Sequence, residues 1–271
     1  MKKLLALLLV LLLMGGAALA EDGAELDWAA YDALIASIKA EGDPAAREAL
    51  MHEAEAMLMD TGAVVPITYY TDPYMMKAGV EGVYDTIEGF KYFMYATYEG
   101  ADTLRINLSS EPDRLDPALN YTLDGACLAV NSFAGLYTHA ADGTLQPELA
   151  TGCTVSEDGL TYAFTLREGL TWSDGTPLTA EDFVYSWQRA ADPATGAAYS
   201  YLFSAIAGYG SEEGLAVEAS EDGLTFTVTL AAPCPYMLDL AAFPVFYPVP
   251  RHCVEAAEGY LAGDGSLLDP G

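Results

Sequence analysis

The sequence predicts an α/β protein in which helices accompany a mixed β-sheet. Three observations carry this prediction: helical periodicity over residues 26–59, a hairpin pattern that occurs twice, at 156–166 and 220–230, and a capped helix that begins at Thr179. Hydrophobic residues make up 52% of the chain and aromatic residues 11%, so a sizeable core can form despite a net charge of −29. The length leaves room for one large domain or two small ones.

The N-terminus has the pattern of a secretory signal peptide. Two lysines precede an apolar run from Leu4 to Met14, and Ala18-Leu19-Ala20 supplies a cleavage site of small residues. We therefore expect residues 1–20 to be removed after Ala20. A retained anchor is the alternative, but the run is shorter than the roughly 20 residues that span a bilayer. No cysteine follows the run directly, so we expect an extracytoplasmic protein, periplasmic or secreted, without a lipid anchor.

Two helices and a strand are expected before residue 71. Apolar residues from Trp28 to Ile38 recur at steps of three and four, and Gly42 then breaks the pattern. Asp43 is a suitable N-cap for the second helix, with Pro44 at its first position. Residues 64–70 predict a buried strand, in which Pro66 indicates an edge or a bulge.

Further along the chain, a strand is expected at 104–108 and a helix at about 124–136. The sequence SEDGLTYAFTL at 156–166 returns as SEDGLTFTVTL at 220–230. Each copy has an Asp-Gly turn followed by strict alternation of apolar and polar residues, which is typical of a hairpin. We expect the two hairpins to share one mixed sheet.

The helix that begins at Thr179 has an N-terminal capping box. Asp182 stands three residues after Thr179, so each side chain can satisfy a backbone N–H at the start of the helix. Phe183, Val184 and Trp187 then form an apolar stripe, and we expect Trp187 to be a core residue.

Cysteine and histidine spacing predicts neither a metal site nor a cofactor. The four cysteines fit no metal or redox motif, and in an exported protein they could be disulfides or buried thiols. The three histidines are far apart and show no H-E-x-x-H pattern. These residues are Cys127, Cys153, Cys234, Cys253, His52, His139 and His252.

The acidic composition argues against nucleic acid as a partner, because 11 basic residues face 40 acidic ones. The acidity favours solubility and could attract cationic solutes, although a solvated surface without a ligand is the simpler interpretation. No G-x-S-x-G nucleophile elbow occurs in the chain. We expect a protein that is not an enzyme.

Several segments resemble the solute-binding proteins of peptide ABC importers. The most specific is WSDGTPLTAEDFVYSWQRAADP at 172–193, and SSEPDRLDP at 109–117 adds to it. Residues 104–271 resemble the beginning of this family, whereas residues 21–99, with VVPITYYTDPYMMK at 64–77, resemble its end. The resemblance therefore implies the first lobe of a type II periplasmic-binding-protein-like fold, permuted and incomplete, with residues 100–103 as a linker and the second lobe missing.

The resemblance also implies a function. Family members capture peptides outside the membrane and deliver them to the permease subunits of the importer. Alignment with the family places Tyr121, Leu123, Tyr201 and, with less support, Tyr199 on the ligand cleft. Internal packing is the alternative interpretation of these side chains. The alternative function is a non-transport remnant, or half of a split receptor that binds solute only with a second-lobe chain.

Overall fold

The computed structural model describes residues 27–71 and 73–257, so the expected signal peptide lies outside the described residues. The chain divides into two compact units at Thr71. This division does not coincide with the predicted linker at 100–103, which lies in an irregular stretch of the second unit.

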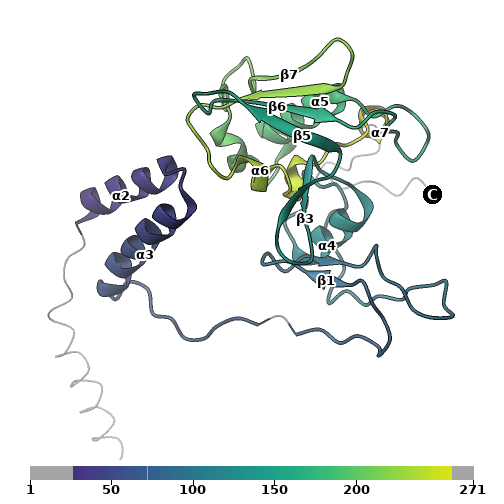
Figure 1. Ribbon diagram of the computed structural model, residues 1–271, viewed down its shortest axis with the longest axis horizontal. Helices are drawn as coiled ribbons and strands as arrows, with labels where there is room; N and C mark the ends of the chain where they lie inside the picture. Colours follow the sequence, from purple (N-terminus) through teal and green to yellow (C-terminus); the bar gives the residue numbers. More distant parts are fainter. Residues whose placement is uncertain (1–26, 72, 258–271) are drawn as a thin grey trace, which may run out of the picture. The chain divides into compact units, whose positions relative to one another are not determined.

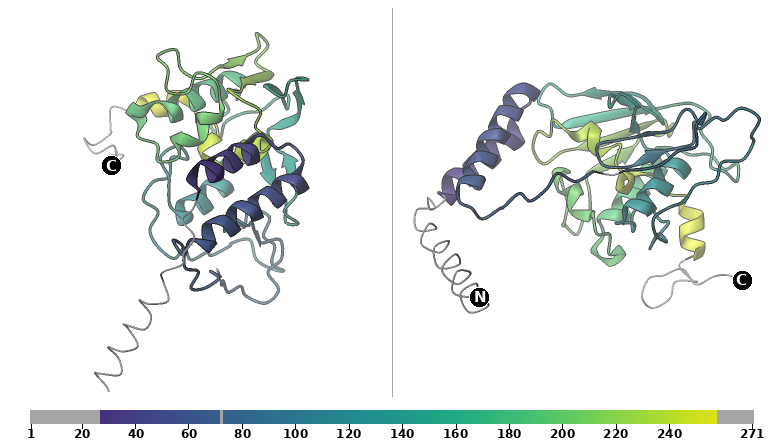
Figure 2. Two further views of the ribbon diagram at one scale, coloured as in Figure 1. Left: turned by 90° about the vertical axis from the view of Figure 1, so that its left-hand side faces the viewer. Right: turned by 90° about the horizontal axis from the view of Figure 1, so that it is seen from below.

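The first unit contains a pair of helices, α2 (Trp28–Ala40) and α3 (Pro44–Asp60), which pack side by side (Figure 2). Both predicted helices are thus confirmed. The Asp43 carboxylate accepts a hydrogen bond of 2.8 Å from the backbone N–H of Ala46, which satisfies an N–H group that the helix itself cannot pair. Among the described residues of this unit, only Ala54 is buried, so the pair has a small core of its own.

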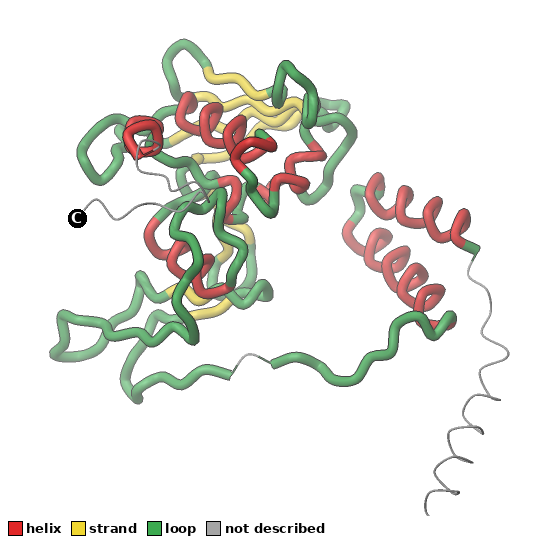
Figure 3. The backbone as a smooth tube through the Cα atoms, turned by 180° about the vertical axis from the view of Figure 1, so that it is seen from behind, coloured by secondary structure: helices red, strands yellow, loops and turns green. Residues whose placement is uncertain are grey.

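The strands predicted at 64–70 and 104–108 are not formed, and both predictions are wrong. Each segment is irregular, and Figure 3 shows the first within the long loop that follows α3. Ile67 is 92% exposed and Tyr69 is 98% exposed, while Ile106 is 49% exposed. Sequence of high strand propensity forms a strand only where a neighbouring strand pairs with its backbone. Within the described residues, no neighbouring strand pairs with either segment.

The second unit is built around a four-stranded sheet. Its order is β5 (Ala150–Val155), β6 (Thr161–Leu166), β8 (Thr225–Thr229) and β7 (Val217–Ala219). The two predicted hairpins are therefore confirmed as β5–β6 and β7–β8 of one sheet. All pairings in this sheet are antiparallel, so the prediction of a mixed sheet is wrong. Short turns join the strands of each hairpin, and only antiparallel strands can be joined in that way.

The repeated SEDG sequence makes the same turn twice. In the first copy, the Ser156 hydroxyl donates to the Asp158 carboxylate (2.5 Å), and the backbone N–H of Thr161 donates to Ser156 Oγ (2.9 Å). In the second copy, Ser220 and Asp222 make the same contact at 2.5 Å. Identical local chemistry thus sets the start of β6 and of β8.

Helix α5 (Ala180–Ala191) covers one face of the sheet, as Figure 1 shows. Phe164 of β6 and Phe226 of β8 lie on that face at paired positions and are fully buried. The predicted capping box is present at the start of the helix, where the Thr179 backbone N–H donates to the Asp182 carboxylate over 2.8 Å.

Trp187 is fully buried, which confirms the prediction that it is a core residue. Its ring centroid lies 4.8 Å from that of Phe226 and 5.0 Å from that of Phe246, both in edge-to-face arrangements. The indole N–H donates a hydrogen bond of 2.8 Å to the carbonyl of Phe246. Trp187 therefore joins α5, the sheet and the segment near residue 246 in one contact.

A smaller core joins α4 (Leu123–Ser132) to a short hairpin of β1 (Tyr84–Asp85) and β2 (Lys91–Tyr92). The Asn131 side chain connects them. Its amide donates to the Lys91 carbonyl over 2.7 Å, and its oxygen accepts from the backbone N–H groups of Phe93 and Met94. Residues from the first third of the chain are thus built into the same unit as the sheet.

Short elements complete the second unit. Strands β3 (Tyr137–His139) and β4 (Leu145–Pro147) form a hairpin between α4 and the sheet. The remaining elements are η1 (Pro193–Thr195), η2 (Ser200–Ala205), α6 (Met237–Leu240), η3 (Pro244–Phe246) and α7 (Arg251–Ala257). None of the helices in the described part of the chain has the length and apolar character needed to cross a membrane.

Glu148 directly follows β4, and its carboxylate accepts a hydrogen bond of 2.8 Å from the backbone N–H of Gly135. Burial raises the pKa of Glu148 to about 7, although the hydrogen bond acts in the opposite direction.

All four cysteines are thiols, and Cys127 and Cys234 are buried.

Replacing Trp187 by alanine should lower the free energy of unfolding by roughly 3–5 kcal/mol, because it empties a core site and leaves the Phe246 carbonyl without its donor. Denaturant unfolding measures this loss. Trp28→Ala is the control, since Trp28 is 55% exposed and should cost under about 1 kcal/mol. A Trp187→Ala loss below about 1 kcal/mol would contradict the burial of this side chain.

Glu148 should make the protein less stable as the pH rises. Its folded pKa of about 7 exceeds the ordinary value of 4.5, so the folded state holds the proton more tightly, and this advantage disappears between those two values. The stability of Glu148→Gln relative to the parent should therefore increase by roughly 2–3 kcal/mol from pH 4 to pH 8. Unfolding curves across this range provide the test.

The matched control for this experiment is Glu157→Gln, because Glu157 is exposed in a turn. It removes one carboxylate, as Glu148→Gln does, but at a position outside the core. If Glu148→Gln and Glu157→Gln gave the same profile, the raised pKa of Glu148 would be refuted.

Candidate functional site

Three of the four predicted ligand-binding residues line one pocket of about 350 Å³ in the second unit. Tyr121, Leu123 and Tyr199 line it directly. Tyr201 is not among the lining residues, but its ring lies 6.2 Å, centroid to centroid, from that of Tyr199. The structure thus gathers all four residues in one region, although 75 or more positions separate the two pairs in the sequence.

The wall of the pocket contains a row of aromatic rings. The Phe90 ring lies 5.7 Å from that of Phe243, and the Phe243 ring lies 5.2 Å from that of Tyr199 in an edge-to-face contact. Tyr201 extends the row and is 58% exposed. We call Phe90, Phe243, Tyr199 and Tyr201 the aromatic row. Its members come from distant parts of the chain, and three of them, Phe90, Phe243 and Tyr199, line the pocket and can contact apolar groups.

Residues 120–123 also line the pocket, and the N-terminal cap of α4 holds them in place. The Asn120 side chain is buried, and it accepts a hydrogen bond of 3.2 Å from the backbone N–H of Thr122 and donates one of 3.1 Å to its carbonyl. Thr122 in turn caps the helix by accepting from the N–H of Gly125. These contacts fix the backbone on both sides of Tyr121, whose side chain is left 60% exposed.

An ion pair holds the loop that leads into this cap. Arg189 on α5 donates to both carboxylate oxygens of Asp116, at 2.6 and 3.3 Å, and both side chains are largely shielded from water. Two-point contact of this kind fixes orientation as well as distance. The segment 116–123 is therefore attached to the core helix at one end and to α4 at the other.

The lining suits binding more than catalysis. Among the residues that line the pocket, Glu88 is the only charged one, and the rest are apolar, aromatic or amide and hydroxyl side chains. The tyrosine hydroxyls can donate and accept hydrogen bonds, and the rings can contact apolar groups.

Sequence reasoning missed the other residues that line this pocket, among them Phe90, Phe243 and Asn120. The two phenylalanines lie in aromatic-rich or apolar stretches, which by themselves indicate packing. Asn120 is next to a predicted site residue, but only the structure shows that its side chain is buried and caps the turn.

Comparison with known proteins supports the resemblance seen in the sequence. Residues 144–265 match the bacterial extracellular solute-binding proteins, family 5 (middle region). The dipeptide-binding protein of Lactococcus lactis is 44% identical over 135 residues, which cover 47% of this chain and 24% of that protein. A probable deoxycholate-binding periplasmic protein of Escherichia coli is 39% identical over 159 residues, or 55% of this chain and 30% of that protein.

The fold comparison agrees with the sequence comparison. The structure of Listeria monocytogenes OppA bound to peptide aligns with a TM-score of 0.51 at 36% identity, and it covers 56% of this chain and 32% of that one. This likeness confirms a partial match to peptide-binding proteins of mixed helix and sheet structure. The chain spans about a third or less of the length of the relatives it matches.

Substituting Gly125 by alanine should disturb the site. A Cβ atom there would collide with the Asn120 side-chain oxygen and approach its Cγ to 2.7 Å. We expect the free energy of unfolding to fall by about 1–3 kcal/mol and the ring signals of Tyr121 to shift in the NMR spectrum. Gly152→Ala is the control, because nothing lies within 4 Å of its added Cβ. Equal behaviour of the two variants would show that Asn120 does not hold the turn.

Proposed function

We propose that this chain supplies part of the peptide-binding surface of an extracytoplasmic solute-binding component of an ABC importer. The observation that carries the proposal is the pocket in which Tyr121 and Leu123 meet three members of the aromatic row, Phe90, Phe243 and Tyr199. Relatives named as dipeptide- and oligopeptide-binding proteins support the choice of ligand. The Sec-type signal pattern at residues 1–20 supports the location outside the membrane.

The aromatic row would contact the side chains of a bound peptide, and the tyrosine hydroxyls would bond to its polar groups. Such contacts are strong only where water is excluded. Tyr121 and Tyr201 are both more than half exposed, so this chain covers a ligand from one side. A second wall, supplied by a second-lobe chain, would enclose it. Permease subunits would then receive the peptide.

The alternative is a non-transport remnant, or half of a split receptor. It is favoured by the same exposure of the Tyr121 and Tyr201 side chains. Because one of the relatives is named as a probable deoxycholate-binding protein, a bile acid belongs among the candidate solutes in any binding experiment.

The chain alone should bind peptides weakly, with dissociation constants at or above roughly the millimolar level, near −4 kcal/mol. A half-open pocket offers few contacts and keeps water at the polar groups. Calorimetry with a peptide library and with deoxycholate measures this. Addition of a polypeptide that supplies the second lobe should tighten peptide binding.

Tyr121→Ala and Tyr201→Ala should each weaken that tightened binding by about fivefold, which corresponds to about 1 kcal/mol of lost aromatic contact. The control is Tyr69→Ala, since Tyr69 is 98% exposed and is not among the pocket residues. Micromolar binding by the chain alone would overturn the half-site interpretation. Absence of peptide binding in the presence of the second lobe would overturn peptide capture.

A further inference from the structure

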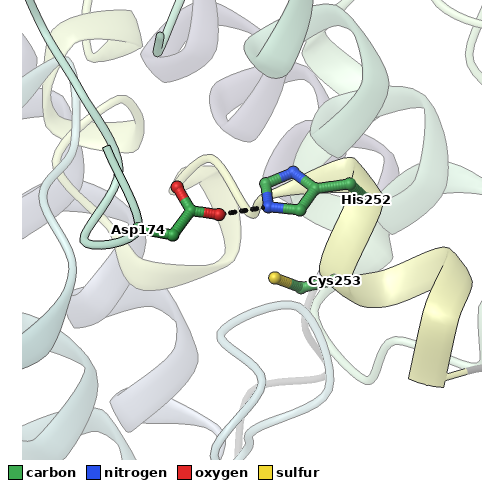
Figure 4. Close-up of side chains that lie close together, drawn as sticks. All are labelled: Asp174, His252 and Cys253. Carbon is green, nitrogen blue, oxygen red and sulfur yellow. Dashed lines mark hydrogen bonds and ion pairs between the residues drawn. The ribbon is translucent and has the colours of Figure 1, made fainter. Parts of the chain in front are cut away.

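A second group of polar side chains lies where the turn at 172–176 meets the start of α7. His252 Nε2 and Asp174 Oδ2 are 2.6 Å apart, and Cys253 lies beside them (Figure 4). One ligand atom of each residue lies within 4.8 Å of the others, and all three residues are exposed. None of them lines the pocket described above.

The turn holds Asp174 in place. Its Oδ1 accepts hydrogen bonds from the backbone N–H of Thr176 (2.9 Å) and from the Thr176 hydroxyl (2.7 Å). Gly175 adopts a φ of +87°, which allows the tight turn, and the Trp172 N–H closes it by donating to the Thr176 carbonyl. Oδ2 therefore remains available to face His252. Partners of this kind orient the ligands of metal sites.

The chain contains a second turn of the same construction. Asp142, Gly143 and Thr144 repeat the sequence, and Asp142 Oδ1 accepts from the Thr144 N–H (3.0 Å) and hydroxyl (2.6 Å). No histidine or cysteine joins Asp142 in a ligand cluster among the described residues. The turn alone is thus an ordinary structural device, and what distinguishes Asp174 is the presence of His252 and Cys253.

The other side of the cluster is anchored to the core. Ser186 Oγ on α5 accepts a hydrogen bond of 2.8 Å from the backbone N–H of Val249, at a buried position. The Pro250 carbonyl then accepts from the N–H groups of Cys253 (3.0 Å) and Val254 (3.1 Å). The neighbouring cation, Arg251, is engaged by the Glu255 carboxylate at 2.6 Å. The backbone that carries His252 and Cys253 is therefore held in a defined position.

We propose that Asp174, His252 and Cys253 bind a divalent cation of intermediate softness, such as Zn²⁺, with water as a further ligand. Sulfur, imidazole nitrogen and carboxylate oxygen are the ligands that zinc uses, whereas Ca²⁺ and Mg²⁺ prefer oxygen alone. Binding releases the thiol proton of Cys253 to solvent, and the thiolate and the carboxylate then balance the charge of the ion. The acidic surface of the chain raises the local cation concentration.

The metal requires only a small rearrangement. Two ligand atoms of a tetrahedral zinc ion stand roughly 3.3–3.7 Å apart, given bond lengths of about 2.0–2.3 Å. The His252–Asp174 contact of 2.6 Å must therefore open, and Cys253 Sγ must approach. The side chains of His252 and Asp174 are 49% and 45% exposed, so both can adjust. A bound ion would fasten the turn to α7.

The test is a titration of the untagged, reduced chain with Co²⁺ and then Zn²⁺. We expect one Co²⁺ per chain with a thiolate-to-cobalt charge-transfer band, and displacement of that band by Zn²⁺. Cys253→Ser should abolish the band, and His252→Ala and Asp174→Asn should each weaken binding by at least about tenfold. Zn²⁺ should also raise the melting temperature of the parent but not of Cys253→Ser.

The matched controls keep each residue type but lie outside the cluster. Asp142→Asn removes the carboxylate of the twin turn, His139→Ala removes another histidine, and Cys153→Ser removes a half-buried thiol. All three should bind Co²⁺ as the parent does. The proposal is overturned if the parent shows no thiolate band at micromolar Co²⁺, or if Asp142→Asn weakens binding as much as Asp174→Asn.

Discussion

The contact on which most of the second unit depends is the hydrogen bond from the Trp187 indole to the Phe246 carbonyl. It lies at the centre of the core, where a buried polar group without a partner would be costly. The neighbouring residue, Ser186, provides a second anchor for this segment, because its hydroxyl oxygen accepts a hydrogen bond from the Val249 backbone N–H. Together these two residues of α5 fix the segment from 243 to 253, which contains the short helix η3 and the start of α7. A capped, amphipathic helix thus organises a stretch of chain that follows it by about 60 positions.

That segment carries three residues of the pocket, Phe243, Pro244 and Val245, and two of the proposed metal cluster. Phe243 belongs to the aromatic row at its beginning, and His252 and Cys253 stand at its end. Between them, Tyr247 is buried against the hairpin of β1 and β2 and donates through its hydroxyl to the Ala242 carbonyl. The pocket and the cluster are therefore positioned by the same core contacts, although they share no side chain. Packing energy is what gives both sites a defined geometry.

Local chemistry was predictable from the sequence, and long-range pairing was not. The capping box at Thr179, the cap at Asp43 and the two SEDG hairpins depend on residues within a few positions of one another. The strands expected at 64–70 and 104–108 failed because strand propensity needs a partner that these segments lack. The resemblance to a known family located Tyr121 and Tyr199, but Phe90 entered the pocket only through tertiary packing. Asp174 and His252 are 78 positions apart, so spacing could not reveal their contact.

The irregular segment at 64–70 has a consequence for how the chain behaves in concentrated solution. It carries six strand-prone or aromatic side chains without a charge, and Ile67 and Tyr69 are almost fully exposed. A stretch of this composition outside any ladder is a template for edge-to-edge association between copies. Pro66 interrupts the row of backbone donors and so limits the template to the residues that follow it. The acidic surface of the chain favours repulsion between copies, whereas the exposed tyrosines of this segment favour their association.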